Sequence, residues 1–274
     1  MTITKTKKIL STLTGVALLL SSSVALAGVA ATNHNLSSAG TGPNTFSGTT
    51  EICVFCHTPH GSDITASVPL WNRSVPLPAT FTTYDSLGTS SLDGAMAQVG
   101  SVSVACLSCH DGAQAMDTIL NDPGSGAVVA SFTAGTWTGA DRPAGIALIG
   151  TELRDDHPIG IAYAGGATGG DFDVAGSLVD KDFKPATETA VGSDLWFVDT
   201  NTNATREKID IQLYTRTNAT ATIFAGGGTI TGAIPFVECA SCHDPHTENT
   251  TFLRVTAVGE GNDTSRVCLA CHIK

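Results

Sequence analysis

The chain is poor in aromatic residues and in charged residues, and it has no cysteine outside one repeated pattern. Aromatic residues make up 6% of it and charged residues 14%, with a formal net charge of −11. So few aromatic side chains supply little of the large apolar area that usually stabilises a core. The acidic balance disfavours nucleic acid as a partner. After residue 27, no apolar run is long enough to span a membrane as a helix, so membrane insertion of the mature chain is not expected.

All eight cysteines belong to four copies of the pattern C-x-x-C-H. The copies are Cys53, Cys56 and His57; Cys106, Cys109 and His110; Cys239, Cys242 and His243; and Cys268, Cys271 and His272. In c-type haem attachment, the two thiols form thioethers and the imidazole takes one axial position of the iron. Zinc ribbons, disulfide frameworks and thioredoxin-like pairs also use C-x-x-C, but none needs a histidine after each second cysteine. The sequence therefore predicts four covalently bound haem c groups.

Four histidines remain outside the motifs, and four irons need a sixth ligand. They are His34, His60, His157 and His246. The match predicts bis-histidine ligation of every iron and hence a low-potential electron carrier rather than an enzyme with an open iron. The alternatives are a surface or propionate-bound residue for His60 and His246, a solvated loop for His157 and a disordered tail for His34.

The order of the motifs indicates a duplicated two-haem unit. C-x-x-C-H-x-P-H is followed by C-L-x-C-H in residues 53–110 and again in residues 239–272. This order suggests His60 for the iron of His110, His246 for that of His272, and His34 and His157 for those of His57 and His243. An alternative is that His34, on a mobile N-terminal arm, ligates a haem of a neighbouring protomer.

The N-terminus has the pattern of an export signal. Lys5, Lys7 and Lys8 precede the apolar run Ile9–Leu20, and Ala25-Leu26-Ala27 forms an A-x-A cleavage site. Cleavage after residue 27 would remove three lysines and no acid, which leaves a formal charge of −14 on residues 28–274. We expect an extracellular or cell-surface protein, with the periplasm as the alternative.

The remaining residues predict little regular structure. We expect a single tetrahaem domain over residues 28–274, with a mostly irregular multihaem cytochrome fold and short helices near the motifs. The two haem units are separated by a loop- and strand-rich spacer at 111–238. Short antiparallel strands are expected within 127–237, at 127–132, 195–198, 208–214 and 229–237. Burial of porphyrin area would replace much of an ordinary core.

Five segments resemble exported multihaem c-type cytochromes of the doubled-CxxCH type. They are Cys53–Gly61, Cys106–Gly112, Asp156–Gly160, Val237–His246 and Phe252–Arg254. More narrowly, four haems, eight histidines and this motif order are similar to the tetrahaem subunits of extracellular cytochrome nanowires. The resemblance implies a continuous stack of bis-histidine haems, in which one iron takes a ligand from the adjoining subunit.

Together these features predict electron transfer through four stacked haems in a homopolymeric extracellular filament. The partners would be redox proteins and an extracellular electron acceptor. One alternative is a monomeric periplasmic or surface shuttle. Another is a multihaem reductase, which would require one open haem and hence one non-ligating spare histidine.

Overall fold

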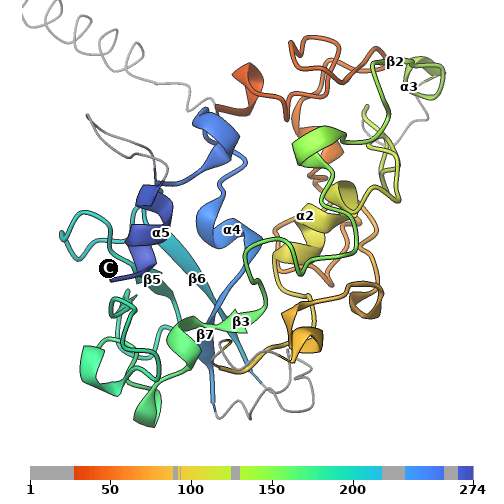
Figure 1. The fold of residues 1–274 in the computed structure, drawn as a ribbon. Helices are drawn as coiled ribbons and strands as arrows, with labels where there is room; N and C mark the ends of the chain where they lie inside the picture. Colours follow the sequence, from red (N-terminus) through yellow and green to blue (C-terminus); the bar gives the residue numbers. More distant parts are fainter. Residues whose placement is uncertain are drawn as a thin grey trace, which may run out of the picture.

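A computed structural model describes residues 28–88, 92, 94–124, 130–217, 232–255 and 265–273 (Figure 1). The predicted signal peptide lies outside these residues. The α-helices are α2 (Ser103–His110), α3 (Ala130–Thr133), α4 (Cys239–Cys242) and α5 (Arg266–Cys271). Short 3₁₀ helices are η1 (Gly28–Ala31), η2 (Cys53–Phe55), η3 (Pro78–Thr80), η4 (Tyr84–Leu87), η5 (Gly145–Ala147), η6 (Tyr163–Gly165), η7 (Thr168–Gly170), η8 (Ala175–Ser177) and η9 (Thr250–Phe252).

The described strands form two antiparallel sheets. The strands are β1 (Thr45–Phe46), β2 (Trp137–Thr138), β3 (Ile161–Ala162), β4 (Thr187–Glu188), β5 (Trp196–Val198), β6 (Ile211–Arg216) and β7 (Ile234–Val237). β1 pairs with β2, and the larger sheet has the order β3-β7-β6-β5-β4. β3 pairs only with the last two residues of β7. Pro235 of β7, which lacks a backbone N–H, is therefore paired only with β6.

The central strand β6 links the sheet to the haem motifs. Ile211 and Leu213 pack into the main apolar cluster with Trp196 and Phe172. Arg216 lies on the other face of β6 from Ile211 and Leu213. It forms an ion pair with Glu238, the residue that precedes α4. Because successive strand side chains point to opposite faces, one face of β6 builds the core and the other meets the third motif.

The N-terminal half packs around smaller apolar clusters beside the first two motifs. Phe46 of β1, Phe55 of η2 and Phe132 of α3 form one cluster, and Trp71 and Leu107 belong to another. Cys56 borders both clusters. The first two motifs are therefore held together by local apolar packing.

The strand predictions have mixed outcomes. β5 lies within the predicted strand 195–198, and β7 within the described part of 229–237. The strand predicted at 208–214 begins only at Ile211, because the Glu207 and Asp210 segment forms a turn held by side-chain bonds. The prediction for 127–132 is wrong in its described part, where Ala130–Thr133 is the helix α3. The structure thus has few helices and two sheets; the multihaem cytochrome fold itself stays a prediction.

Among the described residues, no helix is long and apolar enough to cross a membrane.

Candidate haem-binding site

Each C-x-x-C-H motif is folded as a helical turn. The backbone N–H of His57 donates to the carbonyl of Cys53 at 2.8 Å, and His243 and His272 make the same bond within their motifs at 3.1 and 2.9 Å. The second motif lies entirely within α2. Residues at i, i+3 and i+4 share one face of a helix, so both thiols and the imidazole of a motif lie on one side.

The four motif turns are neighbours in chain order. Figure 1 shows α2, α4 and α5 one beside the next. One thiol of each motif raises the pKa of a thiol in a neighbouring motif: Cys109 acts on Cys56, Cys239 on Cys106, and Cys242 on Cys271. No disulfide joins any two of the eight cysteines. The attachment points therefore follow one another from the first motif to the fourth.

A buried polar cluster joins the second motif to the third. The Glu238 backbone N–H donates to Ser241 Oγ at 2.9 Å, and the Glu238 side chain accepts in return, which fixes the first turn of α4. Ser103 Oγ of α2 donates to Glu238 Oε2 at 2.6 Å, and Arg216 lies 3.3 Å from Glu238 Oε1. Burial raises the pKa of Glu238 to about 7, although Arg216 and Ser103 oppose the shift. This cluster sets the position of α4 against α2.

The motif histidines have a common hydrogen-bond pattern. Nδ1 of His57, His110 and His243 donates to the carbonyls of Pro69, Ala147 and Thr251, at 2.8, 2.6 and 2.8 Å. A carbonyl can only accept, so Nδ1 carries the proton and Nε2 keeps its lone pair. Metal-binding histidines are usually oriented by such a bond. These residues are therefore prepared to bind iron through Nε2.

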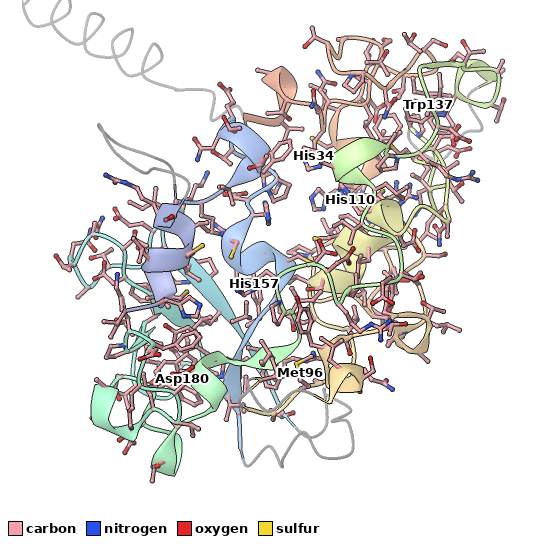
Figure 2. All side chains as sticks on the ribbon, in the orientation of Figure 1. His34, Met96, His110, Trp137, His157 and Asp180 are labelled. Atoms are coloured by element: carbon pink, nitrogen blue, oxygen red, sulfur yellow. The ribbon has the colours of Figure 1, made fainter. Side chains whose placement is uncertain are left out.

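Two spare histidines lie opposite two motif histidines. The rings of His57 and His246 are nearly parallel, at 15°, with centroids 6.2 Å apart. The rings of His34 and His110 are inclined at 75°, with centroids 6.1 Å apart (Figure 2). A metal–imidazole bond of about 2.0 Å, with the donor nitrogen about 1.1 Å from its ring centroid, places two rings across one metal about 6.2 Å apart. Both separations fit an iron held between two imidazoles.

The His246 ring is oriented by an acidic neighbour. Its Nδ1 lies 3.3 Å from Asp244 Oδ1, and Asp244 is also 3.6 Å from Arg254. A carboxylate behind an imidazole fixes its orientation and makes its other nitrogen a better metal ligand. The H-D-P-H sequence thus supplies both the ligand and the group that orients it.

His34 is half-buried and is held by an aromatic neighbour. Its ring stacks on Phe252, with centroids 4.2 Å apart, and its Nδ1 is buried without a hydrogen-bond partner. Burial lowers the pKa of His34 to about 4, and the neighbouring His110 adds to the shift. Burial likewise lowers the pKa of His110, although the Ala147 carbonyl opposes this. Both imidazoles are thus neutral at pH 7, the form that binds metal.

This arrangement differs from the pairing expected from motif order. His246 lies opposite His57 rather than at the fourth motif, and His34 takes the place at His110 that was expected for His60. The reason is a long-range contact: the Gly28 N–H donates to the His246 carbonyl at 3.1 Å, so the N-terminal segment packs against the loop after the third motif. Spacing along the chain carries no signal for that contact.

His60 and His157 are exposed, in contrast to His34. His157 Nδ1 donates to the carbonyl of Pro158 at 3.0 Å. The ring of His272 packs against Phe183, with centroids 4.2 Å apart. The ring contacts of the described residues thus place two of the four spare histidines, His34 and His246, beside motif histidines.

Sequence reasoning missed several residues that support the site. They are Arg73, Ser103, Glu238, Asp244 and Phe252. Asp244 and Glu238 had a detectable signal, because each lies beside a motif. Phe252 belongs to one of the five segments that resemble multihaem cytochromes, but the resemblance gave it no role. Arg73 lies outside those segments and is brought to the site only by folding.

The described residues form no side-chain cluster typical of a free metal ion. No group of three or more His, Cys, Asp or Glu residues among them is arranged so that it could hold one. Haem iron needs only two protein ligands, because the porphyrin supplies the other four. Pairs of histidines beside helical cysteines therefore fit haem better than zinc.

The comparison with known families agrees with this geometry. Residues 235–274, which contain the third and fourth motifs, match the family model described as the doubled CXXCH motif. The match supports a c-type multihaem cytochrome and indicates covalently bound haem c and electron transport. No curated protein sequence matches the chain.

Proposed function

We propose that this chain is an exported tetrahaem cytochrome that carries electrons as a subunit of an extracellular filament. The observation that carries the proposal is the proximity of consecutive motifs: Arg73, which follows the first, bonds to Ser108 of the second, Ser103 of α2 bonds to Glu238 beside the third, and Cys242 of the third raises the pKa of Cys271 in the fourth. Neighbouring attachment points favour closely spaced haems. A series of close haems is a path for electrons from one end of the subunit to the other.

In the proposed carrier, the protein residues attach the cofactor, orient its axial ligands and close the iron to substrates. Haem c, when bound, supplies a one-electron carrier that cycles between ferric and ferrous iron. The thiols of each motif would anchor it covalently, and the carbonyl bonds of the motif histidines would fix the imidazole planes. Bis-histidine ligation would leave the irons closed to small substrates, which favours a carrier over an enzyme.

The two remaining spare histidines, His60 and His157, suggest sixth ligands for the irons of His243 and His272. The segment after His157 is tied to the third motif, because the Gly160 N–H donates to the Val237 carbonyl at 2.8 Å and β3 pairs with β7. We assign His157 to the iron of His243 on this basis. That leaves the iron of His272 and the exposed His60.

We assign His60 to the His272 iron of an adjacent copy. The His60 carbonyl accepts from Thr58 Oγ1 and from Asn121 Nδ2, both at 3.0 Å, so its backbone is fixed while its side chain is exposed. A fixed, exposed ligand on one copy that coordinates an iron of the next would favour head-to-tail addition, which extends without limit when it does not close. The final acceptor would lie outside the cell, and a redox protein would supply the electrons.

The haem count and the spin state test the carrier. Intact-mass measurement of the purified holoprotein should give the cleaved chain plus four haems, and electron paramagnetic resonance should show only low-spin ferric iron. Fewer haems would contradict the tetrahaem assignment. A high-spin signal that shifts with cyanide would favour the reductase.

Hydrodynamic size tests the filament. Sedimentation of the native protein should give long assemblies whose haem absorbance sediments with the polypeptide. A four-haem species of monomer size at every concentration would favour the diffusible shuttle.

A further inference from the structure

Arg73 is a fully buried arginine that follows the first motif. Its side chain is 0% exposed. The preceding residue, Asn72, donates its backbone N–H to the Cys56 carbonyl at 2.9 Å, and Trp71 forms an antiparallel bridge with His57. The backbone at Arg73 is thus fixed against the turn that carries the first pair of cysteines.

The Arg73 guanidinium reaches across to the second motif. Its NH2 group donates to the carbonyls of Ser108 at 3.1 Å and Ala115 at 2.9 Å, and NH1 donates to Met116 at 2.7 Å. Ser108 lies between the two cysteines of the second motif. A single cation is therefore held by backbone carbonyls between two attachment sites.

The charge of Arg73 acts on one cysteine of the first motif and one cysteine of the second. Burial raises the pKa of Cys56 to about 12 and also raises that of Cys109, and in both cases the Arg73 charge opposes the rise. The guanidinium therefore lies near enough to both sulfur atoms to affect their ionisation. One sulfur belongs to the first motif and the other to the second.

No carboxylate forms a direct ion pair with this guanidinium in the described part of the chain, although Asp111 also acts on Cys109. No ion pair there includes Arg73, and its Nε is buried without a hydrogen-bond partner. The arginines near the later motifs differ, because Arg216 lies 3.3 Å from Glu238 and Arg254 lies 3.6 Å from Asp244. A buried charge is poorly screened, so Arg73 has a strong local field.

We infer that Arg73 raises the reduction potentials of the two haems attached at Cys56 and Cys109. The inference rests on the proposed function. Reduction of a ferric haem takes one electron from the donor and lowers the charge of the iron centre by one, with no bond formed or broken. A fixed cation nearby favours the less positive form of that couple, and net charge and burial are among the factors that set such potentials. Electrons would then reside preferentially on the N-terminal pair.

The test is a haem-resolved redox titration of the holoprotein, followed by NMR of the haem methyl groups. Arg73→Met removes the charge and should lower the potentials of the first two haems while the last two stay unchanged. Arg73→Lys keeps the charge and should stay near the wild type. Arg154→Met, which removes an exposed arginine paired with Glu152, is the matched control and should shift none of the four.

The outcomes separate this inference from the proposed function. Unchanged potentials in Arg73→Met, or equal shifts in the Met and Lys variants, would overturn the role of the charge although four haems are bound. Absence of covalent haem from the wild type would instead overturn the proposed function.

If the Arg73→Met variant does not fold with its haems, a haem-resolved redox titration of the wild type tests the inference instead. The N-terminal pair should have higher potentials than the C-terminal pair at both low and high salt, because a buried charge is little screened. Higher potentials for the C-terminal pair would overturn the inference.

Discussion

The imidazole rings of His57 and His246 lie nearly parallel across a centroid distance of 6.2 Å, although they belong to opposite ends of the chain. His57 completes the first motif, and His246 follows the third. Their spacing fits two axial ligands of one iron. The segments that carry the first and the third motif thus pack against each other, although they are far apart in the sequence.

His246→Ala should convert the haem attached at Cys53 and Cys56 to high spin and leave the other three low spin. The reason is that His246 lies opposite His57. Electron paramagnetic resonance of the holoprotein would show one high-spin ferric signal. The same substitution in a variant that lacks the first pair of cysteines should add no high-spin iron. High-spin iron appearing in that background would show that His246 serves another haem.

His34→Ala should open the haem of the second motif without preventing assembly. His34 faces His110 within one chain and stacks on Phe252, so it is not free to reach a neighbouring protomer. We expect one high-spin haem in filaments of normal length, seen by resonance and electron microscopy. Phe252→Leu, which keeps the ligand, serves as the control. Loss of filaments with all four haems still present would restore His34 as the exchanged ligand.

His60→Ala should abolish filaments and yield a folded four-haem monomer with one high-spin iron. The exposed His60 is the residue that we assign to the adjacent copy. Sedimentation velocity and haem staining would measure the result. His157→Ala is the matched comparison, because it should open one haem yet leave assembly intact. Filaments of normal length in the His60 variant would refute the assignment.

Glu238 should make stability depend on pH. Burial raises its pKa from an ordinary 4.5 to about 7, with Arg216 and Ser103 as the facing polar groups and Cys106 and Cys239 nearby. The folded state therefore holds the proton more tightly than the unfolded state. This contribution is complete below about pH 4.5 and is lost as the pH rises through about 7.

Thermal unfolding of the holoprotein at pH 5 and pH 7.5 would measure this dependence. The decrease in stability between the two pH values should be larger for the wild type than for Glu238→Gln, which cannot ionise. Identical pH dependence in the two proteins would argue against a titrating Glu238.

Phe236→Ala should destabilise the holoprotein by about 3–5 kcal/mol, the usual cost of removing a buried aromatic ring. Phe236 is 0% exposed in β7, and its ring lies 5.4 Å from the Arg216 guanidinium carbon. Denaturant unfolding monitored by circular dichroism gives the free energy. The exposed Val191→Ala should change it by less than about 0.5 kcal/mol. A loss below 1 kcal/mol for Phe236→Ala would show that β7 is not part of the stabilising core.

The haem chemistry could be predicted from the sequence because it depends on contiguous residues. C-x-x-C-H defines a helical turn with two thiols and an imidazole on one side, and that turn is present at His57, His243 and His272. The supply of spare histidines also follows from counting. Local patterns of this kind need no knowledge of tertiary structure.

The ligand pairs could not be predicted, because they depend on contacts between distant segments. His34 was treated as an arm with few anchors, yet Asn35 Nδ2 donates to the Ala30 carbonyl and the Phe46 N–H donates to the Leu36 carbonyl. These bonds fold the N-terminus into a compact segment beside His110. The strand predicted at 127–132 is wrong in its described residues, 130–132, for a similar reason, since Phe132 packs against Phe46 from a helical turn.

The central claim is a continuous series of four haems with bis-histidine ligation, extended from one copy to the next. Cryo-electron microscopy of the native haem-containing material tests it most directly. The account predicts filaments in which the haems follow motif order, with His246 on the iron of His57, His34 on that of His110, and His60 crossing the subunit boundary. Discrete particles, or haems separated by protein between consecutive motifs, would contradict it.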